Sequence, residues 1–358
     1  MRILITGICG FVGSTLAFGL KEATSNCEVI GLDNLVRPGS ERNRAELRRH
    51  GIRLFHGDIR NPSDLESLPR CDWILDAAAN PSVLAGVDGK TSSRQLIEHN
   101  LIGTVNLLEM ARNCRAGFLM LSTSRVYSIR DLAAIPVKAK GNRFELTAAR
   151  VTDRTPGGLS ARGVAENFST DPPLSLYGSS KRASEILACE YAEAFDVPVW
   201  INRCGVLAGA GQFGKIDQGI FSFWIHSWRA KRNLKYIGFN GTGYQVRDCL
   251  HASDLLPLIV QQLQRPTAKA PRIVNVSGGI DHSASLRQLS AWCEQRFGKL
   301  QIAADKKARP FDVPWLVLDS SMAQRTWKWQ PHTSLESIWS EIADHAAQNP
   351  NWLDSTAD

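Results

Sequence analysis

The sequence lacks paired cysteines. No two of its eight cysteines form a C-x-x-C pair, and none stand at the short spacing typical of metal ligands. They are Cys9, Cys27, Cys71, Cys114, Cys189, Cys204, Cys249 and Cys293. This dispersal argues against a disulfide framework and against a cysteine metal site. We therefore expect reduced thiols with structural roles and no bound metal.

Long hydrophobic runs are also missing. The chain contains no run of about 18 apolar residues, the length that a membrane-spanning helix requires. It starts directly with a strand-like segment, without the basic and then apolar regions of a secretion signal. No internal repeat or low-complexity tract is found. We therefore expect a cytoplasmic protein without a membrane partner.

Concentrated positive charge is scarce, although the formal net charge is +7. Outside Arg42 to Arg49 and Arg229 to Lys235 the basic residues are scattered, and these two runs are interpreted as solvated helix faces. We expect no nucleic-acid partner, whereas a mildly positive field suits a diphosphate substrate. With 358 residues, of which 43% are apolar, the chain can bury a sizeable core in two domains, or in one with a subdomain.

The first chemical signal is a series of glycines after a short apolar segment. Arg2 to Thr6 predicts a strand, and Gly7, Gly10 and Gly13 lead into an apolar helix pattern that continues to Leu20. Such a turn lets the backbone approach a pyrophosphate at the helix N-terminus. The spacing is G-x-x-G-x-x-G and not G-x-G-x-x-G, but its place after the first strand favours cofactor binding over a plain turn. The expected cofactor contacts here are Gly7, Gly10, Phe11, Val12 and Gly13.

A second predicted strand, Glu28 to Leu32, ends at Asp33-Asn34. An acidic side chain about 20 residues after the glycines can accept hydrogen bonds from an adenosine ribose and repel a 2′-phosphate, which favours NAD over NADP. Arg37 argues the other way, because a nearby arginine can accommodate that phosphate. Asp33 is alternatively a simple turn former.

Further strands are expected at Ile52 to Phe55, Trp73 to Ala79 and Gly117 to Leu121, with a long helix over Leu96 to Cys114. Asp58 either accepts from the adenine amino group or caps a helix. Strands that alternate with helices predict an α/β fold with a doubly wound parallel sheet of the Rossmann type. Further expected cofactor contacts are Asn34, Asp58, Ile59, Ala77, Ala78, Ala79, Asn100 and Ser122.

The segment Leu176 to Lys181 places a phenol and an amine four residues apart. Tyr177 and Lys181 then share one face of a helix expected to run from Tyr177 to Phe195, and a nearby ammonium favours the phenolate form. Taken alone, the pair also fits a half-buried tyrosine and a solvated lysine. Thr123 follows the fifth strand, and ligands collect beyond the carboxyl ends of parallel strands, so Thr123 and Tyr177 should face one crevice.

With these motifs in this order, the chain resembles the extended short-chain dehydrogenase/reductase superfamily of nucleotide-sugar epimerases and dehydratases. Within it, the chain looks most like the CDP-paratose (CDP-tyvelose) 2-epimerase family. That closer resemblance is carried by Leu32-Asp33-Asn34-Leu35, His56 to Asn61, Asp217-Gln218-Gly219 and Gln245 to Asp248.

The resemblance implies that Tyr177 is the catalytic acid and base, that Lys181 binds the nicotinamide ribose and lowers the tyrosine pKa, and that Thr123, assisted by Ser122, hydrogen-bonds the reacting hydroxyl. It implies NAD-dependent epimerisation at C2 of a CDP-linked deoxyhexose through a keto intermediate. The alternatives are a UDP-hexose 4-epimerase and a non-catalytic NAD-binding regulatory protein. A 4,6-dehydratase is disfavoured because Ser124-Arg125 replaces its Asp-Glu pair. The same two residues also differ from the Asn-Lys pair of the tyvelose-type enzymes.

The second half of the chain is expected to bind the substrate. We expect an NAD-binding domain over 1–205, with an irregular insertion at 128–174 near the sugar pocket, and a smaller C-terminal α/β lobe over 206–245 and 266–358. Residues 246–265 should return to the first domain. Arg247 is expected at the substrate diphosphate, alternatively as an ion pair with Asp248, and Gln212 and Arg309 are further substrate contacts.

The remaining aromatic and histidine signals have structural interpretations. Trp224 and Trp228 are expected in the core, with a base-stacking platform as the alternative. His251 and Asp254 are expected to cap a helix, because no second histidine stands at ligand spacing. By resemblance, the helices Leu96 to Cys114 and Tyr177 to Phe195 would pair in a homodimer.

Overall fold

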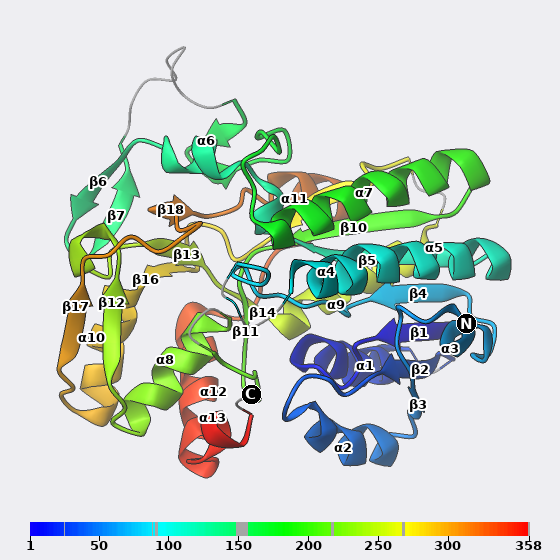
Figure 1. The fold of residues 1–358 in the computed structure, drawn as a ribbon, viewed down its shortest axis with the longest axis horizontal. Helices are drawn as coiled ribbons and strands as arrows, with labels where there is room; N and C mark the ends of the chain where they lie inside the picture. Colours follow the sequence, from blue (N-terminus) through cyan, green and yellow to red (C-terminus); the bar gives the residue numbers. More distant parts are fainter. Residues whose placement is uncertain are drawn as a thin grey trace.

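A computed structural model describes residues 1–24, 26–87, 89, 92–147, 157–215, 218–266 and 269–356. Its centre is a seven-stranded sheet in the order β15-β10-β5-β4-β1-β2-β3, in which every neighbouring pair is parallel (Figure 1). The order runs outward in both directions from the first strands of the chain, which confirms the predicted doubly wound Rossmann pattern. The strands are β1 (Arg2–Thr6), β2 (Glu28–Asp33), β3 (Arg53–His56), β4 (Trp73–Asp76), β5 (Gly117–Thr123), β10 (Val199–Cys204) and β15 (Ile273–Val276).

Two strands end two or more residues away from their predicted ends. The strand from Trp73 was expected to reach Ala79, but it ends at Asp76, opposite Thr6, where its neighbour β1 also ends. The following alanines leave the sheet and lie against the backbone of Gly7. Strand β5 instead continues to Thr123, because β10 pairs with it as far as Cys204.

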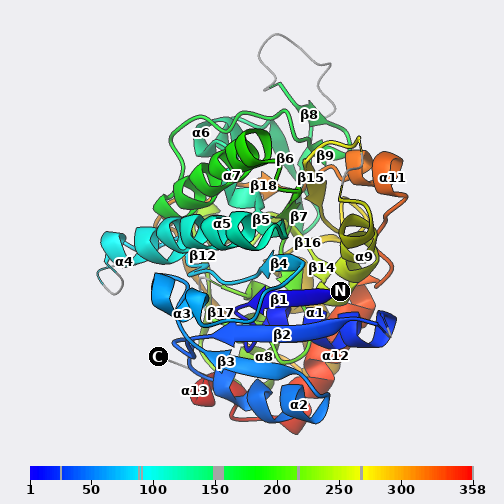
Figure 2. The same cartoon turned by 90° about the vertical axis from the view of Figure 1, so that its right-hand side faces the viewer.

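Helices cover both faces of the sheet (Figure 2). Apolar side chains of α1, α2, α9 and α11 pack on one face, and those of α3, α5 and α7 pack on the other. Helices α5 and α7 lie side by side in both views. The bounds are α1 (Phe11–Ala23), α2 (Asn43–Arg49), α3 (Pro62–Glu66), α4 (Ser93–Ile97), α5 (Gly103–Cys114), α7 (Leu176–Phe195), α9 (Leu256–Gln264) and α11 (Ser321–Trp327).

A second group of elements lies beyond the carboxyl ends of the sheet strands and has its own core. Helices α8, α10 and α12 pack together with β12, and Trp224 and Trp228 are buried there, which confirms their predicted core role. Its helices are α8 (Ile220–Arg229), α10 (Leu286–Phe297), α12 (Leu335–Gln348) and α13 (Trp352–Ser355). Its short strands are β11 (Leu207–Ala208), β12 (Leu234–Ile237), β13 (Val246–Asp248), β14 (Leu250–His251), β16 (Ser283–Ser285), β17 (Ile302–Asp305) and β18 (Trp315–Leu316).

The insertion at 128–174 was predicted to be irregular, and this was wrong. Its described residues form α6 (Ile129–Ala133), β6 (Val137–Lys140), β7 (Arg143–Leu146), β8 (Leu159–Ser160) and β9 (Gly163–Val164). Val164 and Phe168 pack into a core with Val313 and its neighbours up to Leu318. The insertion is ordered by a segment about 150 residues further along the chain. Positions 148–156 of this insertion lie outside the described residues.

Short helical turns complete the chain. They are the 3₁₀ turns η1 (Ser40–Arg42), η3 (Ser124–Val126), η4 (Phe239–Gly241) and η5 (Ala252–Leu255), and the π-helical turn η2 (Glu98–Ile102). All eight cysteines are free thiols. Among the described residues, no helix is long and apolar enough to cross a bilayer, and no three His, Cys, Asp or Glu side chains are grouped closely enough to hold a metal ion.

Candidate active site

The glycine-rich turn between β1 and α1 has room for backbone only. A Cβ at Gly7, whose φ is +63°, would lie 2.9 Å from the Ala78 Cα, and a Cβ at Gly13 would lie 2.3 Å from the Gly7 carbonyl oxygen. Gly10 precedes α1 and has no side chain to cap the first amides of the helix. The turn therefore leaves a bare helix N-terminus at the end of β1, as an anionic diphosphate requires.

Asp33 stands at the end of β2 beside this turn. Its Oδ2 accepts from the Cys9 amide at 2.8 Å and its Oδ1 accepts from the Leu35 amide at 2.8 Å. Burial raises the pKa of Asp33, and these two hydrogen bonds oppose the rise. Arg37 donates to the carbonyl oxygen of Phe213 and to Gln218, so its guanidinium is engaged by the loop that follows β11.

Asp58 does not cap a helix; that alternative was wrong, because Asn61 caps α3. The carboxylate of Asp58 accepts from Asn34 at 2.9 Å and from Arg60 at 2.7 Å. Although burial alone would raise the pKa of Asp58, the hydrogen bonds from Arg60 and Asn34 hold it below its ordinary value. The neighbouring Ile59 is buried in the core, against Gly103.

Asn100 connects two parts of the site. The expected helix over Leu96 to Cys114 contains the π-helical turn η2, and buried Asn100 lies in it. Its Nδ2 donates to the Asn80 carbonyl at 3.0 Å and to the Ser180 hydroxyl at 3.2 Å, and its Oδ1 accepts from the Asn80 amide at 2.8 Å. Asn100 thereby fixes the segment after Ala77 to Ala79 relative to the helix that carries Tyr177.

Tyr177 and Lys181 lie in the first turns of α7, where the Ser175 hydroxyl accepts from the Gly178 amide at 3.0 Å. Both side chains are buried, with exposed fractions of 8% and 2%. The interpretation of Lys181 as a solvated lysine was therefore wrong. Tyr177 forms a hydrogen bond with the Thr123 side chain at the end of β5. The two side chains therefore meet at the carboxyl end of β5, as the strand-end rule predicts.

The electrostatics of this pair differ from the simple two-residue picture. Burial raises the pKa of Tyr177, while the Thr123 hydrogen bond and the charge of Arg125 lower it. Burial lowers the pKa of Lys181, while the charges of Asp76 and Glu185 raise it. Arg125 thus acts directly on the phenol, and the ammonium of Lys181 is supported by two carboxylates.

Asp76 ends β4 near Lys181 and is fully buried. Its Oδ1 accepts from the Thr6 hydroxyl at 2.8 Å, and its Oδ2 has no hydrogen-bond partner in the described part of the chain. Burial raises the pKa of Asp76, and the charge of Lys181 opposes the rise. A carboxyl group therefore lies behind the lysine.

Ser122 does not face the crevice. Its buried hydroxyl donates to Glu185 at 2.6 Å, and Glu185 also accepts from Arg203 at 2.7 Å. Successive side chains of a strand point to opposite faces, so Thr123 and Ser122 cannot both reach one ligand. The expectation that Ser122 assists at the cofactor or substrate is corrected to a structural role.

Of the predicted substrate contacts, Arg247 and Arg309 approach the tyrosine region and Gln212 does not. Arg247 pairs with Asp312 at 2.7 Å and not with Asp248, which instead accepts from Ser277 at 2.6 Å. The charges of Arg247 and Arg309 both act on Arg125. Gln212 packs under the C-terminal segment, where its carbonyl accepts from Trp352. Asp217, part of a predicted motif, lies outside the described residues.

Sequence reasoning missed Asp76 and noted Arg125 and Cys204 only as departures from related enzymes near the expected sugar pocket, without giving them a role. Each lies at or just after the carboxyl end of a sheet strand, so the rule that indicated Thr123 could have indicated them. Cys204 lies opposite Thr123 in the sheet, and burial raises the pKa of its thiol to about 12, so it is a neutral thiol beside Lys181.

His251 and Asp254 have the structural roles that were predicted. His251 precedes η5 and accepts from the Ser253 amide. Asp254 accepts from the amides of His332 and Thr333 at 3.1 and 3.0 Å. Both residues therefore hold turns of the chain.

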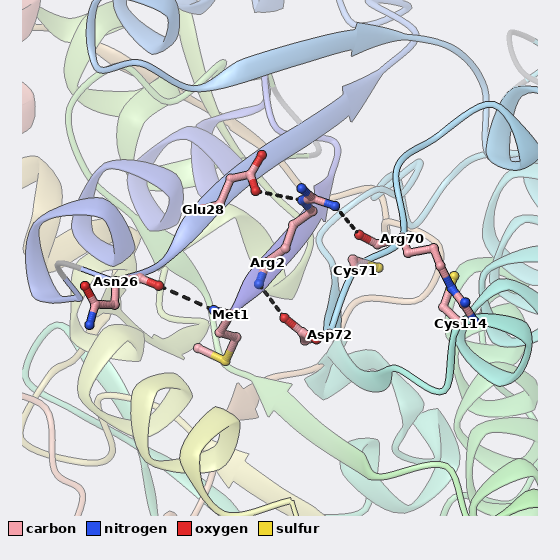
Figure 3. A pocket seen from close by; sticks show the side chains of 8 residues that line it. All are labelled: Met1, Arg2, Asn26, Glu28, Arg70, Cys71, Asp72 and Cys114. Carbon is pink, nitrogen blue, oxygen red and sulfur yellow. Dashed lines mark hydrogen bonds and ion pairs between the residues drawn. The ribbon is translucent and has the colours of Figure 1, made fainter.

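The amino ends of the sheet strands, opposite the candidate site, carry a separate set of polar contacts. A surface hollow of about 550 Å³ lies at the amino ends of the strands, and Arg2 there pairs with Glu28 and donates to the carbonyl oxygen of Arg70 (Figure 3). Asp72 accepts from the Arg2 amide. These contacts tie strand starts together, and the catalytic candidates all lie at the other edge.

Comparisons with known proteins agree with this geometry. Residues 3–277 match the family model "NAD dependent epimerase/dehydratase family". The chain is 30% identical over 354 residues to the CDP-paratose 2-epimerase of Salmonella typhi, covering 93% of this chain and 96% of the relative. It is 25% identical to the UDP-glucuronate 4-epimerase of Thermodesulfobacterium geofontis, covering 97% and 96%. The structure of a Bacillus cereus UDP-glucuronic acid 4-epimerase, in complex with UDP-glucuronic acid and NAD, matches with a TM-score of 0.75 at 23% identity, over 97% of this chain and 99% of that one.

Proposed function

Because the chain belongs to the NAD-dependent epimerase/dehydratase family, we propose that it inverts one hydroxyl-bearing carbon of a nucleotide-diphosphate sugar. The observation that carries this proposal is the Tyr177 phenol, buried and hydrogen-bonded to Thr123 at a strand end, with Lys181 buried one helical turn away. A proton acceptor, a second hydroxyl and a cation in one crevice are what reversible oxidation of an alcohol needs.

The residues at the β1–α1 turn fit NAD, the cofactor of this family. Its diphosphate would lie on the amides of Phe11 and Val12, where the glycines leave no side chain in the way, and its ribose would meet Asp33 at the end of β2. We assign Ala77, Ala78 and Ala79 to the wall beside the cofactor, and Asn100 to the support of that wall. When bound, NAD accepts a hydride from the sugar carbon and returns it.

The chain's own residues move and hold the proton. Tyr177 removes the proton of the reacting hydroxyl, and Thr123 holds that hydroxyl by a hydrogen bond. Lys181 binds the nicotinamide ribose. The sugar becomes a ketone at the reacting carbon, turns over in the crevice, and regains its proton from Tyr177 with the opposite configuration, so net redox change is zero.

The substrate diphosphate is assigned to Arg247 and Arg309. A guanidinium can clamp phosphate oxygens through parallel hydrogen bonds, and both arginines come from the C-terminal elements that face the crevice. The relative at 30% identity makes the interconversion of CDP-paratose and CDP-tyvelose at C2 the first reaction to test. Inversion at C4 of a UDP-linked hexose is the second candidate, favoured by the match to UDP-glucuronate 4-epimerases along nearly the whole chain.

The experiment compares Tyr177→Phe with Tyr191→Phe. Both tyrosines are on α7, but Tyr191 lies nearly four helical turns further along, where it bonds to Glu109 of α5. Turnover of CDP-paratose and of UDP-glucuronate is followed by NMR. We expect Tyr177→Phe to lose at least about 1,000-fold in kcat and Tyr191→Phe to keep its activity. Full activity of Tyr177→Phe would refute the catalytic assignment.

A second arm tests the hydride path. The reaction is run in deuterated water, and the inverted carbon should carry no solvent deuterium, because the hydride returns from the cofactor. Deuterium at that carbon would show proton abstraction from carbon instead. A protein that binds NAD but converts none of these sugars would support the alternative of a regulatory NAD-binding protein.

A further inference from the structure

Three arginines converge on one carboxylate next to Tyr177. Arg125, Arg247 and Arg309 act on one another through their charges, and Asp312 is the acid among them. We call these four residues the arginine cluster. Arg125 comes from η3 directly after β5, whereas the other three come from the C-terminal part of the chain.

The Asp312 carboxylate of the arginine cluster already has hydrogen-bond partners within the protein. Asp312 pairs with the Arg247 Nη2 at 2.7 Å and also accepts from Gln245 at 3.2 Å and from the Val313 amide at 3.0 Å. In the described part of the chain, the guanidinium of Arg125 makes one hydrogen bond, from Nη1 to the Phe311 carbonyl oxygen at 3.3 Å. Arg125 is thus a half-buried cation without a hydrogen-bonded anion.

The backbone of Arg125 is held firmly against the catalytic pair. Its amide donates to the Thr123 hydroxyl oxygen at 3.2 Å. Its carbonyl oxygen would lie 2.2 Å from a Cβ at Gly178, so the start of α7 packs directly on it. The backbone of Arg125 is therefore in contact both with Thr123 and with the first turn of the helix that carries Tyr177.

Burial and the charge of Arg247 lower the pKa of Arg125 to about 10, while the charge of Asp312 opposes this fall, so the group stays cationic at neutral pH. Keeping a charge partly buried without a partner costs stability. A ligand anion at this place would remove that cost. A planar guanidinium matches a carboxylate in two parallel hydrogen bonds, which a lysine at the same position could not do.

We propose that Arg125 is a specificity-determining residue that binds a carboxylate on the sugar ring, so that the substrate is a nucleotide-diphosphate sugar whose sugar is itself acidic. The inference rests on the proposed function, and it ranks an acidic sugar above a neutral deoxy sugar. Arg247 and Arg309 remain assigned to the substrate diphosphate, and Arg125 binds the sugar carboxylate at the other end of the substrate.

The test uses two ligands that differ only at C6 of the sugar, UDP-glucuronate and UDP-glucose, together with UDP alone. Binding to the NAD-loaded protein is measured by calorimetry for the unaltered chain, Arg125→Gln, Arg125→Lys and the control Arg130→Gln. Arg130 is exposed on α6, five residues along. We expect the unaltered chain and Arg130→Gln to bind UDP-glucuronate at least 10-fold more tightly than UDP-glucose. Arg125→Gln should lose about 100-fold in affinity for UDP-glucuronate, Arg125→Lys about 10-fold, and neither should change for UDP-glucose or UDP.

Two results would overturn the proposal. If the unaltered chain binds UDP-glucuronate no more tightly than UDP-glucose, Arg125 does not read a sugar carboxylate. If Arg125→Gln weakens all three ligands equally, Arg125 belongs to the diphosphate clamp. Retention of UDP affinity by Arg125→Gln serves as the check that the variant is folded. Since binding and not turnover is measured, failure here is distinct from failure of the proposed function, which the Tyr177→Phe experiment decides.

Discussion

At the scale of single residues, Tyr177 is governed by two opposing effects. Burial disfavours the phenolate, and the Thr123 hydroxyl and the Arg125 charge favour it. The pKa of Tyr177 is nevertheless above its ordinary value, so the free protein holds a neutral phenol at pH 7. Activity should therefore rise with pH as the phenolate forms.

This gives a pH prediction for Thr123→Val. Loss of the hydrogen bond raises the pKa of Tyr177 further, so the acid limb of the kcat/KM profile should move to higher pH, and activity at pH 7 should fall about 100-fold. Profiles over pH 6 to 10 measure the shift. Thr123→Ser keeps a hydroxyl and should restore the original limb. If the acid limb of the kcat/KM profile does not move in Thr123→Val, Thr123 does not influence the pKa of Tyr177.

A second residue-scale prediction concerns Glu185 behind the site. This carboxylate is fully buried and accepts from Arg203, Arg182 and Ser122. Glu185→Gln leaves the buried Arg203 cation without its counter-ion, so the free energy of unfolding should fall by about 3 to 5 kcal/mol. Denaturant titration measures it against Glu190→Gln, an exposed position on the same helix. Equal stability of the two variants would contradict the assignment.

At the scale of elements, the β1–α1 turn depends on backbone contacts. Gly13→Ala would put a Cβ 2.3 Å from the Gly7 carbonyl oxygen and 2.8 Å from the Ile8 Cα, both backbone atoms that cannot swing aside. We expect α1 to shift, the purified protein to retain less than about one-tenth of the NAD of the unaltered chain, and stability to fall by about 1 to 3 kcal/mol. NAD released by acid is measured. The control Gly157→Ala, with no atom within 4 Å of its Cβ, should retain as much NAD as the unaltered chain. Equal NAD contents in the two variants would contradict the assignment of the β1–α1 turn to NAD binding.

Local sequence patterns predicted some elements of the fold and failed to predict others. The sheet strands are continuous apolar runs flanked by glycines and charges, and these local signals predicted them within a few residues. The π-helical turn at Asn100 and the strands inside 128–174 were not predicted. The first follows from hydrogen bonds of Asn100 to Asn80 and Ser180, and the second from packing against Val313 to Leu318. Both depend on partners distant in the sequence.

At the scale of the whole molecule, α7 and the helix formed by η2 and α5 carry exposed apolar side chains. Ile102 is 44% exposed, Ile186 47% and Phe195 43%. This surface is where we propose that two chains associate. The division of the chain into 1–205 with 246–265, and 206–245 with 266–358, stays a prediction.

The dimer prediction is tested by mass. Light scattering should give twice the 39.5 kDa of one chain for the unaltered protein. Ile186→Glu should give a single chain, because a carboxylate in an apolar interface costs several kcal/mol unless it is paired. Ile280→Glu alters an exposed isoleucine outside these helices and should leave the dimer intact. A monomeric mass for the unaltered protein would withdraw the proposal.

The sequence alone predicted the class of fold, the glycine turn after β1 and the grouping of Tyr177, Lys181 and Thr123, because each depends on residues close together in the chain or on a position at a strand end. Only the tertiary structure showed that Ser122 donates to Glu185 and that Arg247 pairs with Asp312. It also showed that the one hydrogen bond of the Arg125 guanidinium in the described part of the chain is to a carbonyl oxygen and not to an anion. Those outcomes depend on which charges meet after the C-terminal segment folds over the sheet. The pairings of Ser122 with Glu185 and of Arg247 with Asp312 join residues 63 and 65 positions apart, so no local sequence pattern indicates them.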